Sequence, residues 1–200
     1  MAKAKDLARQ LRQAARKTMY GVGPEKVFCI GFQKTGTSSL GTALHLLGYT
    51  VANHVRYRDV VPTEQAVIGD LVARLDRYNA FQDTPWYLYY EIFYHAFPDA
   101  KFILTTREED SWHRSMCRFF GDAWNPMHIF IYGTHDPANN KDAFVSRYRA
   151  HNDAVRTFFA KDPDRFAEVD LSRDDAWAVL SGLLECRTPR APFPHENRRG

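Results

Sequence analysis

Short apolar runs alternate with longer amphipathic segments along this chain, and the alternation predicts its main elements. Five apolar runs are expected as strands: residues 26–30, 49–52, 80–82, 101–106 and 165–171. Segments with helical spacing lie between and after them: residues 36–47, 63–78, 86–97, 108–120, 142–160 and 172–184. Strands that alternate with helices form a parallel sheet covered by helices on both faces. The pattern therefore predicts an α/β fold, a three-layer sandwich around a central parallel sheet.

The remaining segments complete the predicted organisation. Residues 1–25 are expected as a basic N-terminal helix or extension, and residues 26–200 as a single domain with one continuous core. Residues 121–140 combine Gly, Pro and Asn with aromatic residues without a clear period, which predicts a long loop. Large apolar side chains of this loop are candidates for a substrate lid: Trp124, Met127, Phe130 and Tyr132. Ser172 is the expected N-cap of the last helix.

Composition and charge narrow the class of protein. The 200 residues are 44% hydrophobic and 26% charged, which is typical of a soluble globular domain. A net charge of +3 suits a small anionic substrate and is too small to indicate nucleic acid. Three widely spaced cysteines suggest neither a disulfide framework nor a zinc site, and they fit a reducing compartment. Since no apolar run is long enough to span a bilayer, we expect no stable membrane insertion and a cytoplasmic protein.

The turn between the first strand and the first long helix carries the clearest chemistry. Gly31 and Gly36 have the spacing of a Walker A loop, G-x-x-x-x-G-K-[ST], but Thr37 stands where that loop has its lysine, and Lys34 lies earlier. Strand–turn–helix geometry directs backbone N–H groups and a helix N-terminus at an anion. Residues 31–39, called the anion loop below, are therefore predicted to bind a phosphate-like group. The simpler alternative is a helix start capped by a threonine, with a solvated lysine.

A second candidate follows the most strand-like run of the chain. Arg107 comes directly after residues 101–106, and Ser115 lies about two turns along the next helix. Ligands of such sheets bind outside the carboxyl ends of the strands, so Arg107 is expected at the same edge as Lys34. A guanidinium and a hydroxyl together suit a terminal phosphate. The alternative is that Arg107 pairs with an adjacent glutamate and Ser115 is a surface residue.

A third candidate is a possible general base. Asp83 ends the run at residues 80–82 and precedes Pro85, again at the expected binding edge. A carboxylate beside apolar rings can have a raised pKa, which suits base catalysis near neutral pH. Asp83 could equally be the N-cap of the helix that follows. His54, just after the second strand, is the next candidate for the base.

These segments together resemble the sulfotransferases that use 3′-phosphoadenosine 5′-phosphosulfate (PAPS). The resemblance rests on GFQKTGTSS at residues 31–39, on TTREEDSWHRSM at residues 105–116 and on a closing D-L strand, helix and PFPHEN. It extends over about residues 26–197. One departure concerns the base: cytosolic members have a histidine two residues before the proline, where this chain has Asp83.

The resemblance implies a fold of the P-loop nucleotide-binding type and a role for each matched residue. The expected ligands of the 5′-phosphosulfate are Lys34, Thr35, Gly36, Thr37, Ser38 and Ser39. Arg107 and Ser115 are expected to hold the 3′-phosphate, where Arg198 and Arg199 could also reach. Lys34 would stabilise the leaving oxygens, and Asp83 or His54 would accept the proton of the acceptor.

The implied reaction moves a sulfuryl group to an acceptor hydroxyl or amine and leaves adenosine 3′,5′-bisphosphate. We expect no metal, because a nucleotide triphosphatase needs an aspartate where this chain has Thr106 and Arg107. The acceptor, a small molecule or a glycan, is not identified by the sequence, and neither is the oligomeric state. Two other functions stay open: a small-molecule kinase on the same fold, and a non-catalytic module that binds a nucleotide.

Overall fold

A five-stranded parallel sheet forms the centre of the molecule. The computed structural model describes residues 2–196, so Arg198 and Arg199 lie outside the described residues. The strands are β1 (Val27–Cys29), β2 (Val51–Ala52), β3 (Ala80–Phe81), β4 (Lys101–Thr106) and β5 (Phe166–Asp170). Their order is β2-β3-β1-β4-β5, and every neighbouring pair is parallel. All five expected strands are therefore confirmed: β4 has the predicted bounds, and the other four are shorter than expected.

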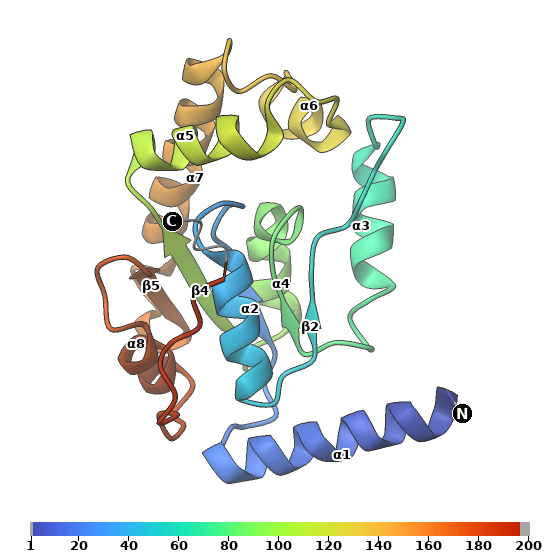
Figure 1. The fold of residues 1–200 in the computed structure, drawn as a ribbon, viewed down its shortest axis with the longest axis vertical. Helices are drawn as coiled ribbons and strands as arrows, with labels where there is room; N and C mark the ends of the chain where they lie inside the picture. Colours follow the sequence, from blue (N-terminus) through green and yellow to red (C-terminus); the bar gives the residue numbers. More distant parts are fainter. Residues whose placement is uncertain (1, 197–200) are drawn as a thin grey trace.

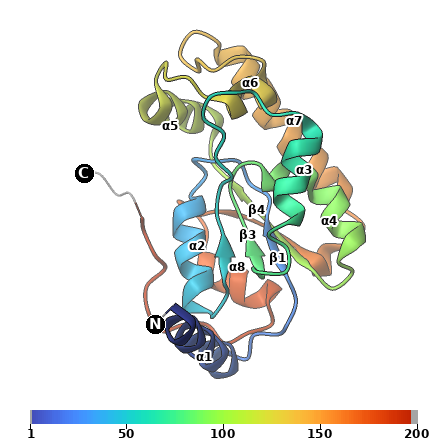
Figure 2. The ribbon, with the colours of Figure 1, turned by 90° about the vertical axis from the view of Figure 1, so that its right-hand side faces the viewer.

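Helices cover both faces of the sheet, as Figure 2 shows from the side. One face carries α2 (Thr37–Leu46) and α8 (Ala176–Leu183). The other carries α3 (Glu64–Val72), the 3-10 helix η1 (Trp86–Tyr89) with α4 (Tyr90–Ala96), and α7 (Lys141–Phe159). A short 3-10 turn, η2 (Pro163–Arg165), leads into β5. The expected three-layer α/β sandwich is confirmed.

The two ends of the sheet carry different elements (Figure 1). At the carboxyl end lie α5 (Glu109–Phe120) and α6 (Pro126–Tyr132), and at the opposite end lies α1 (Ala2–Tyr20). The second half of α1 contacts the domain. Thr50 donates a hydrogen bond to the Gln13 side chain (2.9 Å), and Lys17 lies over the Tyr49 ring at 4.5 Å from its centroid. Within residues 2–196, none of the helices is both long and apolar enough to cross a bilayer.

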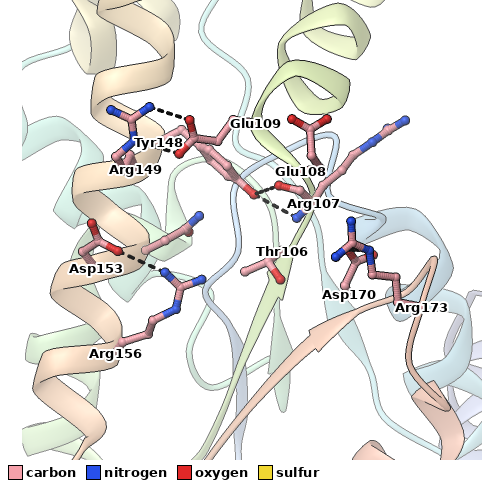
Figure 3. Close-up of a pocket in the computed structure, with 11 residues that line it drawn as sticks. Thr106, Arg107, Glu108, Glu109, Tyr148, Arg149, Asp153, Arg156, Asp170 and Arg173 are labelled. Carbon is pink, nitrogen blue, oxygen red and sulfur yellow. Dashed lines mark hydrogen bonds and ion pairs between the residues drawn. The ribbon is translucent and has the colours of Figure 1, made fainter.

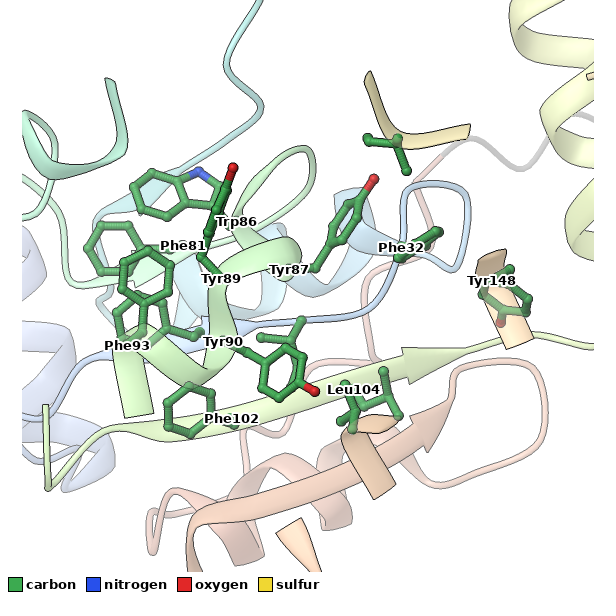
Figure 4. Packing of buried hydrophobic residues seen from close by; sticks show 14 of the residues in the cluster. Phe32, Phe81, Trp86, Tyr87, Tyr89, Tyr90, Phe93, Phe102, Leu104 and Tyr148 are labelled. Carbon is green, nitrogen blue, oxygen red and sulfur yellow. The ribbon is translucent and has the colours of Figure 1, made fainter. Parts of the chain in front are cut away.

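Aromatic side chains fill the core between the sheet and the helices α4 and α7 (Figure 4). Phe28 of β1 stacks on Phe81 and on Phe93, with ring centroids 4.8 and 4.5 Å apart. Trp86 and Tyr87 of η1 are fully buried. The buried aromatic residues of the helix expected at residues 86–97 therefore belong to the core, and the first turn of that helix is 3-10 rather than α.

The prediction of a structureless loop at residues 121–140 is wrong, because that segment contains α6. The Asn125 side chain accepts hydrogen bonds from the backbone N–H groups of Met127 and His128, and Pro126 occupies the first turn. Met127 and Tyr132 are buried in the core, so they cannot form part of an exposed lid. Trp124 is 55% exposed and stays available to a ligand.

Two helix boundaries also differ from expectation. The last helix is capped by Asp175, which accepts from the Ala178 N–H (3.1 Å), and not by Ser172. Ser172 instead donates to Asp170 (2.6 Å) in the turn after β5. The helix expected at residues 63–78 ends at Val72 and continues as turns.

Candidate functional site

The anion loop owes its shape to close contacts within the protein. Gly31 lies against Thr105 of β4, and an added Cβ would come within 2.7 Å of the Thr105 backbone nitrogen. The Thr35 hydroxyl is buried and bonded to the Phe32 carbonyl and to the Thr105 hydroxyl, at 2.6 Å each. Thr35 thus holds the loop in place, and only its backbone is left to face a ligand.

The N-terminus of α2 begins inside the anion loop. Its N-cap is Gly36, with φ 102°, a left-handed conformation that strains any other residue. No side chain caps this end, so neither threonine cap of the simpler alternative is present in the described structure. The first backbone N–H groups of a helix have no partner within it and favour a negative charge. Ser38 in this first turn is exposed to solvent.

Lys34 is a half-buried residue of the anion loop. Its φ of 70° is also left-handed, which is uncommon for a residue with a side chain and typical of functional turns. The Nζ atom lies 3.6 Å from the centroid of the Phe119 ring on α5. A cation over an aromatic face is stabilised by the negative charge density of the ring.

Arg107 reaches the anion loop from the neighbouring strand. Its Nη1 donates to the Lys34 carbonyl (3.4 Å), and its Nε donates to Ser111 Oγ (2.9 Å). The Tyr148 hydroxyl bonds both the backbone N–H and the carbonyl of Arg107, at 2.9 Å each, and so fixes the start of α5. Lys34 and Arg107 therefore lie at one site, as their positions after β1 and β4 predict.

The alternative in which an adjacent glutamate neutralises Arg107 is wrong, because both glutamates are engaged elsewhere. Glu108 caps α5 by accepting from the N–H groups of Asp110 and Ser111, at 2.8 Å each. Glu109 forms a two-point ion pair with Arg149 of α7, which lowers the pKa of the Glu109 carboxyl. The charge of Arg107 is left to act on the loop.

Ser111 is a site residue that the sequence interpretation missed. It accepts from Arg107, four residues earlier, and it lies four residues before Ser115, so Ser111 and Ser115 share one face of α5. The i, i+4 spacing could have indicated it. Ser115 is half-buried one turn further along α5.

Asp83 lies against the anion loop from the side of β3. Its Oδ2 accepts from the Thr37 hydroxyl (3.3 Å), and its Oδ1 accepts from the Thr84 N–H (2.7 Å). The N-cap of η1 is Pro85, without a side-chain hydrogen bond, so Asp83 does not cap that helix. Its φ of 69° makes it a second left-handed residue at this edge.

His54 is less closely connected with the site. It is exposed, and its Nε2 accepts from Arg56 Nε (3.3 Å). The next residue, Val55, donates its N–H to the Thr84 carbonyl (2.9 Å), which puts His54 at the same sheet edge. No hydrogen bond of the described residues links the His54 ring to the anion loop.

The other side of Arg107 borders an open pocket of about 390 Å³ (Figure 3). Its charged side chains are balanced: four arginines (Arg107, Arg149, Arg156 and Arg173) face four carboxylates (Glu108, Glu109, Asp153 and Asp170). Arg149, Arg156 and Arg173 each pair with a carboxylate. The pocket thus has no excess of positive charge, so the anion loop is the better site for a phosphate.

Comparison with known proteins agrees with this geometry. A family model described as a sulfotransferase domain matches residues 26–141 and 121–200. The chain belongs to this sulfotransferase family. It is also similar to "Ava biosynthesis cluster protein M" of Aspergillus versicolor, with 26% identity over 211 residues, 85% of this chain and 80% of that protein. The resemblance inferred from the anion loop and the Arg107 segment is confirmed at the level of the family.

The residues of this sulfotransferase domain fit a bisphosphorylated nucleotide in their chemistry. The uncapped start of α2, Lys34 and Arg107 supply N–H donors and two positive charges at one edge of the sheet. Residues 2–196 contain no group of three or more His, Cys, Asp or Glu side chains placed to hold a metal ion.

Proposed function

We propose that this protein transfers a sulfuryl group from PAPS to a hydroxyl or amine of a small-molecule acceptor. The hydrogen bond from Arg107 to the Lys34 carbonyl carries the proposal, because it unites the two cationic segments at the anion loop. The name of the Aspergillus relative refers to a biosynthesis cluster, which favours a small molecule as the acceptor over a glycan. Three free cysteines fit a reducing compartment, so we propose the cytoplasm as its location.

Both ends of the cofactor have candidate ligands in the chain. The backbone N–H groups of Thr37, Ser38 and Ser39 at the start of α2 would hold the 5′-phosphosulfate, while the Thr37 hydroxyl donates to Asp83. Arg107, supported by Ser111 and with Ser115 on the same face, would hold the 3′-phosphate. A guanidinium fork suits a phosphate because it donates two parallel hydrogen bonds.

PAPS supplies an activated sulfuryl group, and the chain supplies charge and a proton acceptor. The Lys34 ammonium would stabilise the negative charge that develops on the 5′-phosphate oxygen as the old S–O bond breaks. Asp83 would accept the proton of the acceptor as the new bond to sulfur forms. Thr37 would orient the Asp83 carboxylate through their hydrogen bond. His54 is proposed as the base only if Asp83 proves dispensable.

Nucleotide binding and transfer test the proposal in two steps. Isothermal titration with adenosine 3′,5′-bisphosphate should show one site per chain, and ATP with Mg²⁺ should bind at least tenfold more weakly. Incubation with ³⁵S-labelled PAPS and a panel of 2-naphthol, a sterol, an aliphatic alcohol and an aryl amine should then label at least one acceptor.

Each result assigns the function differently. Preference for ATP with phosphoryl transfer would indicate a kinase. Bisphosphate binding without transfer to any acceptor would indicate a non-catalytic module. Failure to bind the bisphosphate would refute the cofactor assignment itself.

A further inference from the structure

We infer that Gln33, which no part of the proposed chemistry uses, is a positioning residue that fixes Asp83 relative to Lys34. The inference rests on the proposed function and concerns the same site. Gln33 directly precedes Lys34, and only 4% of its surface is exposed. A buried amide at the centre of a ligand loop costs free energy unless each polar atom is satisfied.

All polar atoms of the Gln33 side chain have partners outside the anion loop. Its Oε1 accepts from the hydroxyls of Tyr87 (2.6 Å) and Thr84 (3.2 Å), and its Nε2 donates to the Tyr132 hydroxyl (3.0 Å). The Gln33 carbonyl also accepts from Trp112 Nε1 (2.9 Å). Burial raises the pKa of Tyr87 and Tyr132, so both hydroxyls stay protonated.

These hydrogen bonds join the two segments that carry the proposed chemistry. Thr84 directly follows Asp83, just as Lys34 directly follows Gln33. The hydrogen bond between Gln33 and Thr84 therefore links the segment of the proposed base to the segment of Lys34. Tyr132 and Trp112 anchor the same amide to α6 and α5.

The backbone at both ends of this link is strained. Lys34 and Asp83 have φ values of 70° and 69°, and this left-handed conformation is unfavourable for a residue with a side chain. Such conformations persist only where the surroundings over-determine them. The Gln33 amide supplies that constraint for the Asp83 segment through Thr84, which is why we assign it a positioning role and not only a role in stability.

Substitution of Gln33 separates positioning from folding. Gln33→Met keeps the length of the side chain and removes its hydrogen bonds. With the best acceptor of the panel, kcat should fall roughly 10- to 100-fold, since small displacements at a reacting centre have effects of that size. The KM for PAPS and the affinity for adenosine 3′,5′-bisphosphate should change less than about threefold, because the phosphate ligands are untouched.

Two matched variants divide the network. Thr84→Val cuts the connection to the Asp83 segment and should reproduce most of the loss in kcat. Tyr132→Phe cuts the connection to α6 and should lower thermal stability with little change in kcat. Thr84→Val also serves if Gln33→Met does not fold.

A double variant tests whether the effect of Gln33 on kcat depends on Asp83, which a purely structural role would not require. If Gln33 acts through Asp83, Gln33→Met should lower kcat less than about threefold once Asp83→Asn is present. A full multiplicative loss in the double variant, or unchanged kcat in Gln33→Met, would overturn the inference. If the wild type labels no acceptor, the proposed function fails first; if it does, only the role of Gln33 is at stake.

Discussion

Individual residues at the carboxyl edge of the sheet depart from ordinary backbone geometry where the chemistry is proposed. Lys34 and Asp83 are both left-handed, and both belong to the segments that meet at the anion loop. Aspartate adopts this conformation more often than most residues and lysine does so rarely, but the sequence does not show at which positions they do. The sequence did predict that a lysine of the turn and a carboxylate after β3 lie at this edge of the sheet.

The first prediction at the residue scale concerns Lys34. Lys34→Ala should lower turnover on the order of 100-fold or more, because a preorganised positive charge at the leaving group is lost. Turnover with ³⁵S-labelled PAPS measures the effect. Lys161→Ala, which alters an exposed lysine after α7, should leave turnover unchanged. Near-normal turnover in Lys34→Ala would remove this residue from the mechanism.

The second prediction concerns acid stability and His151. This histidine is buried, and its Nε2 donates to the Ile30 carbonyl (2.7 Å) just before the anion loop. Burial lowers its pKa to about 4, below the ordinary 6.5. Between these pH values the His151 side chain binds a proton in the unfolded state but not in the folded state. Its contribution to the free energy of unfolding is therefore fully present above pH 6.5 and is lost as the pH falls to 4.

The contribution of His151 over that window is roughly 3 kcal/mol. Urea unfolding between pH 7.5 and 4.5 should show a shallower decline for His151→Gln, which keeps a donor for Ile30 and does not titrate. Parallel curves for the two proteins would contradict the assignment of this loss to His151.

At the scale of elements, the contact between β1 and β4 decides the geometry of the site. Because Gly31 lies against Thr105, the anion loop can cross close to the end of β4 and meet Arg107. The order of the strands in the sheet puts these elements side by side. The sequence predicts each strand separately, but their adjacency is a property of the fold.

Two glycine substitutions test that contact. Gly31→Ala should destabilise the protein by about 3 kcal/mol or more, because its methyl group would overlap backbone atoms of Thr105. Gly69→Ala is the matched control in α3, where nothing lies within 4 Å of an added Cβ, and it should stabilise by about 0.5–1 kcal/mol. Denaturant unfolding measures both, and similar values for the two variants would contradict the proposed role of Gly31.

The prediction from composition missed the helix α6, because local capping residues start a helix there. The segment at residues 121–140 has the content of a loop, yet Asn125 and Pro126 start a short helix whose apolar residues join the core. A helix this short has too few turns to show a period in the sequence. The composition therefore predicts a lid that includes Met127 and Tyr132, whereas both residues belong to the core.

At the scale of the whole molecule, α1 lies at the end of the sheet opposite the site (Figure 1). Its first half carries Leu7 and Leu11, 57% and 63% exposed, and its second half contacts the domain through Gln13 and Lys17. The backbone carbonyl of Tyr20 also accepts from the Arg187 N–H (2.7 Å). The second half of α1 thus packs on the domain that the sequence predicts to begin at residue 26.

Two truncations test how much of α1 the domain requires. Removal of residues 2–11 should leave the melting temperature within about 2 °C, since Leu7 and Leu11 are exposed and contribute little. Removal of residues 2–20 should lower it by about 4–8 °C, which corresponds to roughly 2 kcal/mol in a protein of this size. Equal melting temperatures for both truncations would show that α1 is a separable extension, as the sequence suggests.

The sequence by itself determined the α/β class, the five strands, the anion loop and the positions of Lys34, Asp83 and Arg107. It could do so because hydrophobic period and turn chemistry are local properties, written in neighbouring residues. Only the tertiary structure decided that Thr37 holds Asp83 and that Gln33 joins the two sides of the site. Those contacts join segments up to 51 residues apart, and they exist only once packing of the sheet brings the segments together.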